Sequence, residues 1–202
     1  MRAISLLLPV LVFAGFQPGE AQEARDASTE TSERYTIDPN HSAVVFRIKH
    51  IGVSYVYGRF NEMRGSFVLD PKNPESCEIG VRIPVKSVDT ARAGRDKHLR
   101  SPDFFNAKEF PEIAFKSRKV EKLEGDRYEV TGDLSLLGKT RSLTAEAEFV
   151  GKGTTQRFGT RAGFSCEFTI KRSDFGMNFM VKNKMVGDEV KIFIGVEGTL
   201  KK

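Results

Sequence analysis

Hydrophobic and polar side chains alternate along most of this chain. In residues 42–50 the apolar positions are Val44, Phe46 and Ile48, and the same alternation recurs in residues 77–85, 127–136 and 162–170. Because successive side chains of a β-strand point to opposite faces of the sheet, each segment has one apolar and one polar face. Several such strands need a common interior, and a sheet that closes on itself supplies it without exposed edges. The pattern therefore predicts a mainly β fold, a single antiparallel barrel.

Glycine and proline divide the chain into about eight predicted strands, which is the number that closes a small barrel. The strands are expected at 35–50 (interrupted at Pro39-Asn40), 59–70, 77–85, 112–123, 127–136, 140–151, 159–172 and 188–200. We expect a connector at 51–58 that could form a short helix, and a bulge or sharp bend at Gly65. Residues 173–187, rich in Phe and Met, are expected to be irregular.

The alternation stops between residues 89 and 106, where short helices are expected between two strands. One helix, capped by Asp89 or Thr90, should end near Arg100, because Pro102 disfavours helical geometry at the residue before it. A second helix should begin at Ser101, with Pro102 at its first position.

The N-terminus has the features of an export signal. Residues 1–21 combine a basic start, a short apolar run and small residues near Ala21, and they predict a signal peptide. The polar residues 22–34 indicate a flexible tether, which leaves residues 35–202 as one barrel domain. The sequence therefore predicts an exported, periplasmic protein that is soluble after cleavage.

The net charge of +5 arises from 32 basic and 27 acidic residues that are well mixed along the chain. Without a basic patch interleaved with aromatic residues, a nucleic-acid partner is not expected. The sign of the charge permits transient contact with an anionic membrane surface. Cys77 and Cys166 allow one disulfide in an oxidising compartment, or they could be two separate small apolar residues.

Catalytic and metal-binding motifs are not evident. The three histidines, His41, His50 and His98, lack metal-ligand spacing, and a Gly-x-Ser-x-Gly elbow is missing. We therefore expect no enzyme activity and no metal site, although a site assembled in space stays open.

The densest charge cluster lies in residues 89–105. Its helices could simply cap one barrel opening. Alternatively, the cluster could bind the polar head of a ligand, with Asp89 and Asp96 tempering the positive field. The head-group candidates are Arg92, Arg95, Lys97 and His98.

Several motifs also resemble those of one family. They lie at residues 35–38 with His41, and at 46–52, 58–60, 87–90, 95–101, 103–105, 131–134 and 174–176. In these the chain resembles the YceI-like family of exported polyisoprenoid-binding proteins. The resemblance implies a lipocalin-like barrel that holds an isoprenoid or quinone-like lipid in an apolar channel, and no other cofactor. The two cysteines do not belong to the family pattern.

The functional question is whether the barrel is packed solid or encloses a channel. A channel predicts a carrier or reservoir for such a lipid. A stress-response protein that binds another amphiphile and an enzyme that acts on a bound lipid head are competing hypotheses, and a homodimer is also open. The predicted channel lining is Val44, Phe46, Ile48, Phe60, Phe67, Leu69, Ile79, Val81, Ile83, Leu99, Phe104, Phe105, Phe115, Leu134, Leu136, Phe164, Phe168, Phe175, Met177 and Phe193.

Overall fold

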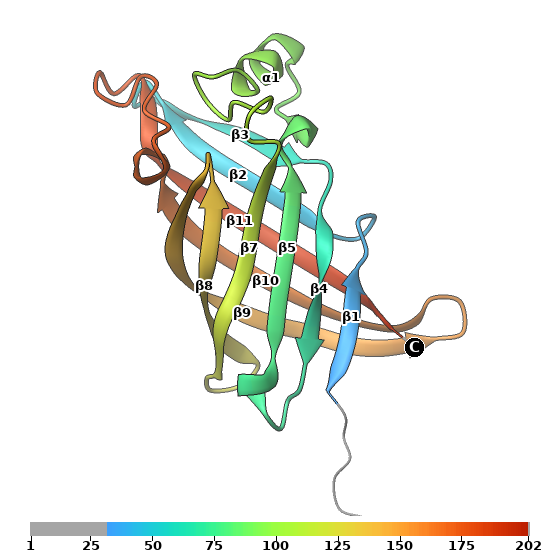
Figure 1. The fold of residues 1–202 in the computed structure, drawn as a ribbon. Helices are drawn as coiled ribbons and strands as arrows, with labels where there is room; N and C mark the ends of the chain where they lie inside the picture. The colour runs from blue at the N-terminus through green and yellow to red at the C-terminus, as the bar shows by residue number, and fades with distance from the viewer. Residues whose placement is uncertain (1–31, 202) are drawn as a thin grey trace, which may run out of the picture. The chain divides into compact units, whose positions relative to one another are not determined.

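The computed structural model describes residues 32–201 (Figure 1). The predicted signal peptide, residues 1–21, and the tether up to residue 31 lie outside the described residues. The first strand already includes Glu33 and Arg34, the last two residues of the predicted tether.

Within the described residues, eleven β-segments form one antiparallel sheet. They are β1 (Glu33–Ile37), β2 (Ala43–His50), β3 (Ser54–Phe60), β4 (Arg64–Leu69), β5 (Glu78–Pro84), β6 (Val88–Asp89), β7 (Glu112–Lys122), β8 (Arg127–Leu136), β9 (Lys139–Thr155), β10 (Gly159–Lys171) and β11 (Val186–Leu200). The strand order is β1-β4-β5-β7-β8-β9-β10-β11-β2-β3-β6, and β1 also pairs with β11. This additional pairing closes the sheet into a ring.

Three of the barrel strands are interrupted. β1 and β2 both pair with β11, each along a different part of it. On their other side, β4 pairs with β1 and β3 pairs with β2. Next in the wall, β5 pairs with β4 and β6 pairs with β3. Each of the pairs β1/β2, β3/β4 and β5/β6 therefore occupies one position in the wall. The result is the predicted closed, antiparallel, eight-stranded barrel.

The connector at 51–58 is not a helix, and this prediction was wrong. A tight turn at Ile51 and Gly52, both with positive φ, leads directly into β3 at Ser54. The predicted bend falls at residues 61–63, between β3 and β4. Gly65 itself stays in register, and a Cβ there would collide with the carbonyl oxygen of Gly80. Glycine is therefore needed for close approach of two strands rather than for a bulge.

Of the two α-helices predicted between residues 89 and 106, one forms. It is α1 (Ala93–Leu99), which begins after Arg92 without a side-chain cap. Residues 101–106 form turns instead, in which the Phe104 and Asn106 amides both donate to the Ser101 carbonyl. Phe104 is buried in one apolar cluster, Phe105 packs against that cluster and against a second one, and the positive φ of Asn106 ends the segment. Tertiary packing therefore overrides the local helix signal.

Short 3₁₀ turns complete the fold: η1 (Pro74–Ser76), η2 (Val85–Ser87) and η3 (Arg172–Phe175). The predicted irregular segment lies mainly between η3 and β11. In contrast, the gap of residues 152–158 between two predicted strands shrinks to residues 156–158, because β9 continues to Thr155 while β10 begins at Gly159 as predicted.

Candidate binding cavity

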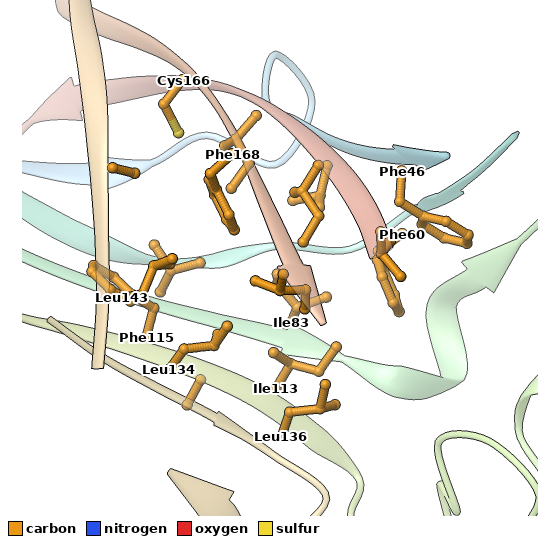
Figure 2. A pocket seen from close by; sticks show the side chains of 18 of the residues that line it. Phe46, Phe60, Ile83, Ile113, Phe115, Leu134, Leu136, Leu143, Cys166 and Phe168 are labelled. Carbon is orange, nitrogen blue, oxygen red and sulfur yellow. The ribbon is translucent and has the colours of Figure 1, made fainter. Parts of the chain in front are cut away.

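The barrel encloses a cavity of about 510 Å³. Its wall consists of inward-pointing side chains from most of the strands, together with α1 and the segment between η3 and β11. Figure 2 shows Phe46 beside Phe60 on one part of this wall, with Phe115 and Phe168 on other parts. An eight-stranded barrel can be filled by its own side chains or can hold one small ligand. The volume lies within the usual range of ligand pockets, roughly 300–1,000 Å³.

The structure places all but two of the predicted lining residues around this cavity. Phe193 is one exception, and the prediction for it was wrong. Its neighbours Ile192 and Ile194 point inward, so Phe193 lies on the outer face, where its ring centroid is 5.2 Å from the Lys191 ammonium nitrogen. Phe175 is the other exception. It is buried in η3 and packs in the cluster of Phe104, Leu134, Leu136 and Met177, so it supports the wall without reaching the cavity.

Sequence reasoning missed a further set of lining residues. Four of these residues lie in the part of β11 where the alternation of apolar side chains could have identified them. On β9 most of the lining side chains are small, so the alternation there is a weaker indication. The missed residues include Ile113, Leu143, Ala145, Val190, Ile192, Ile194 and Val196.

Both cysteines line the cavity, and in the structure both are free thiols. Burial raises the pKa of Cys77, and it raises the pKa of Cys166 to about 11. Because the thiolate is the nucleophile, neither sulfur is poised for chemistry at neutral pH.

The cavity reaches the surface at one end of the barrel. Apart from Ser165, the exposed lining residues are Lys49 and His50 at the end of β2, Arg95 and His98 on α1, and Met180. Figure 1 shows α1 and the segment between η3 and β11 at this same end. We call it the open end. The rest of the lining is almost entirely apolar.

Two of the four head-group candidates line the open end, and two do not. Arg95 and His98 line it, whereas Arg92 and Lys97 lie exposed outside the lining. Arg95 is held by Thr90, with Nε donating to the hydroxyl at 2.7 Å and an Nη donating to the carbonyl at 2.8 Å. These bonds fix a positive charge at the cavity mouth.

His98 also lines the open end and joins α1 to the opposite side of it. Its Nε2 lies 2.7 Å from an Asp103 carboxylate oxygen, and its ring centroid lies 5.2 Å from that of Phe179. Two of the segments that form the open end, α1 and residues 176–185, are therefore in contact, and both are insertions between strands.

Arg172, at the start of η3, is a lining residue that the sequence did not reveal. Its side chain is among the most deeply buried in the described chain, at 2% exposed. The guanidinium donates to four carbonyl oxygens, those of Met177, Phe179, Val186 and Gly187, at 2.7–3.0 Å. Desolvation lowers the pKa of Arg172, and Asp188 opposes that shift. Arg172 therefore fastens residues 176–187 over the open end.

One side of the wall lacks a continuous ladder. The pairing of β9 with β10 ends at Ala147 and Cys166, although β9 continues to pair with β8 and β10 with β11. Leu143 and Phe168, which line the cavity, lie beyond this point on the two diverging strands. Strands without mutual hydrogen bonds separate more easily than paired ones, so this is a deformable part of the wall.

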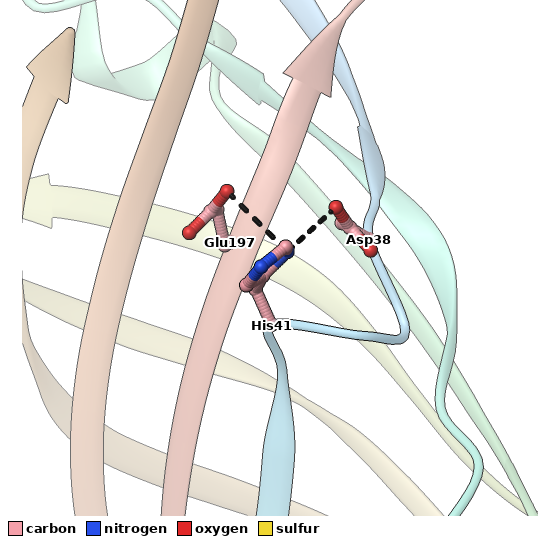
Figure 3. Close-up of side chains that lie close together, drawn as sticks. All are labelled: Asp38, His41 and Glu197. Carbon is pink, nitrogen blue, oxygen red and sulfur yellow. Dashed lines mark hydrogen bonds and ion pairs between the residues drawn. The ribbon is translucent and has the colours of Figure 1, made fainter. Parts of the chain in front are cut away.

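A second cluster of polar groups lies outside the barrel, where the strand is interrupted between β1 and β2 (Figure 3). His41 Nδ1 lies 3.0 Å from an Asp38 carboxylate oxygen and 3.9 Å from a Glu197 carboxylate oxygen. These atoms are close enough together to hold a metal ion. However, the Arg161 guanidinium already pairs with both carboxylates, at 2.5 and 3.0 Å. We interpret the cluster as an ion-pair network that holds the interrupted strand in place.

These features define a class of protein: a closed antiparallel barrel with an apolar, ligand-sized cavity that opens at one end. The sequence comparison identifies the family, because residues 35–198 match the YceI-like domain. The chain therefore belongs to the YceI-like family. Within residues 32–201, no helix has the length and apolar character that a membrane crossing requires.

Individual proteins resemble this chain in sequence or in fold. The chain is 42% identical to the protein YceI of Escherichia coli O157:H7 over 178 residues, which cover 87% of this chain and 92% of that protein. The crystal structure of BcnA from Burkholderia cenocepacia is similar with a TM-score of 0.73 and 25% identity, covering 81% of this chain and 99% of that one. A polyisoprenoid-binding domain from Saccharophagus degradans shares the fold, with a TM-score of 0.64 and 13% identity over 83% of this chain and 98% of that domain.

Proposed function

We propose that this protein is an exported lipid-binding protein that holds an isoprenoid or quinone-like lipid in its barrel, as a carrier or reservoir. The observation that carries the proposal is the cavity of about 510 Å³, whose apolar wall gives way to basic side chains at the open end. An amphiphile with a long apolar tail and a compact polar head matches this distribution. The Saccharophagus domain that shares this fold is a polyisoprenoid-binding domain, which supports the same ligand class.

The free energy of moving a lipid from a membrane into the cavity determines which features of the lipid the site can select. A lipid tail gains about 0.8 kcal/mol for each CH₂ that leaves water. A membrane lipid, however, moves from one apolar environment to another, so that gain largely cancels. Affinity must then come from the shape of the wall and from contacts with the head group. Arg95 and His98 lie where a head group would emerge. We propose shape-selective exchange at a membrane surface rather than capture from water.

The experiment is to fill the cavity without disturbing the wall. In Ala145→Phe a large ring would occupy the space that Ala145 now lines, whereas Thr144→Phe places the same ring on the outer face of the same strand. Protein isolated under mild conditions is extracted with organic solvent, and the extract is analysed by mass spectrometry. We expect an apolar lipid from wild type and Thr144→Phe, and a large loss from Ala145→Phe. Empty extracts from the folded wild type, together with failure to take up isoprenoid lipid, would overturn the proposal.

The same extract distinguishes this function from its competitors. An amphiphile without an isoprenoid tail would identify a carrier of another class. Chemical conversion of the bound lipid by the purified protein would show an enzyme.

A further inference from the structure

Four large apolar side chains are exposed beside the open end. Val53 is 79% exposed, Ile51 45%, Met185 42% and Met180 39%. Ile51 and Val53 belong to the turn between β2 and β3, and the methionines belong to the segment between η3 and β11. We call these four residues the apolar tip.

The apolar tip is one surface, although its parts are far apart in sequence. The Ile51 amide donates to the Met185 carbonyl at 2.8 Å, and the Val186 amide donates to the Met180 carbonyl at 3.2 Å. Val186 also pairs with His50 across the β2–β11 ladder. In Figure 1 the β2–β3 turn and the segment before β11 lie side by side. Met180 also lines the cavity, so the tip adjoins its mouth.

Basic groups flank the apolar tip. Residues 43–58 contain Arg47 and Lys49, residues 176–187 contain Lys182 and Lys184, and neither segment contains a carboxylate. The next carboxylate along the chain, that of Asp188, accepts hydrogen bonds from Ser173. Elsewhere in the sequence acidic and basic residues are mixed, so the excess of positive charge in these two segments is a local feature.

Exposed tyrosines lie next to these basic residues on β3. Tyr55 is 48% and Tyr57 55% exposed, and they pair across the ladder with Lys49 and Arg47. The Arg47 guanidinium carbon lies 4.6 Å from the centroid of the Tyr55 ring. Tyrosine with lysine or arginine behind a small apolar projection is the composition that favours the interface between lipid head groups and acyl chains.

From this arrangement we propose that the apolar tip docks the open end onto an anionic lipid bilayer. Ile51, Val53, Met180 and Met185 would enter the interface, and the lysines would contact the anionic head groups. A second copy of the chain suits this surface less well, because two-fold symmetry would bring the same lysines together. The inference rests on the proposed carrier function, since docking here places the cavity mouth against the membrane that holds the cargo.

The absence of tryptophan from the chain provides a clean assay. Val53→Trp introduces a single fluorophore at the most exposed position of the tip, where substitution should leave the fold intact. Phe158→Trp is the matched control: Phe158 is a 47% exposed aromatic residue in the loop between β9 and β10, away from the tip in Figure 1. The probes are vesicles of phosphatidylethanolamine with phosphatidylglycerol, and vesicles of phosphatidylcholine alone.

We expect a blue shift of Val53→Trp emission with phosphatidylglycerol vesicles and a much smaller one with phosphatidylcholine, whereas Phe158→Trp should not respond. In the Val53→Trp background, Lys182→Ala with Lys184→Ala should weaken the partitioning by roughly tenfold or more. Lys116→Ala with Lys201→Ala, which removes the same charge elsewhere, should change it little. Circular dichroism and melting verify that each variant is folded.

Several outcomes would overturn the inference. These are no shift in folded Val53→Trp, an equal shift in Phe158→Trp, or equal binding to both vesicle types. A shift that grows with protein concentration in the absence of vesicles would identify a second copy as the occupant. Lipid extraction from the same samples separates the two proposals: cargo without docking overturns only the docking surface, whereas docking without cargo overturns the carrier function.

Discussion

Replacing Arg172 by Met should loosen residues 176–187, which lie over the open end. The guanidinium makes four hydrogen bonds to carbonyls, and the side chain is only 2% exposed. A hydrogen bond from a charged donor contributes at least about 1.5 kcal/mol, so the loss of four without any compensation would cost about 6 kcal/mol. Some carbonyls regain water if the segment opens. We therefore expect a loss of about 3–4 kcal/mol in the free energy of unfolding.

Thermal melting and amide hydrogen exchange measure this loss. For a domain of this size, about 3–4 kcal/mol corresponds to a decrease in Tm of roughly 6–16 °C. The amides of Ile51, Met177 and Val186, which bond to or within residues 172–186, should exchange faster. Lys171→Met, at an exposed neighbouring position, is the control, and Arg172→Lys should fall between it and Arg172→Met because lysine has fewer donors. An Arg172→Met protein with unchanged Tm and exchange would refute the fastening role.

Two further predictions concern charged and reactive groups. Hydrogen bonds from Arg161 and His41 hold the pKa of Asp38 far below its ordinary value. The folded pKa is depressed, so this stabilisation is present above the unfolded value of about 3.9 and is lost as pH falls through the folded value. Asp38→Asn should thus lower the urea midpoint at neutral pH by an amount equivalent to about 1 kcal/mol. The destabilisation should be smaller in acid, and an equal destabilisation at both pH values would contradict this account. Burial raises the pKa of Cys166 to about 11, so iodoacetamide should modify it slowly in the folded protein and rapidly in urea, and bound lipid should slow it further; rapid modification without urea would show an open wall.

Much of the fold follows from local pattern. The β8 bounds and the break between β1 and β2 can be predicted because alternation and Pro39-Asn40 act locally. Other features depend on distant contacts. Apolar residues at consecutive positions, as in Ile192-Phe193-Ile194, leave the inward face ambiguous, and only the ladder resolves it. Nothing near Arg172 in sequence shows that four carbonyls will surround it.

Whether the barrel carries cargo is the central question, and native mass spectrometry of the protein isolated without detergent answers it. We predict a mass that exceeds the chain by one apolar amphiphile, and Ala145→Phe should show the chain alone. Wild type that showed only the chain mass, both as isolated and after incubation with isoprenoid-containing vesicles, would contradict the carrier function.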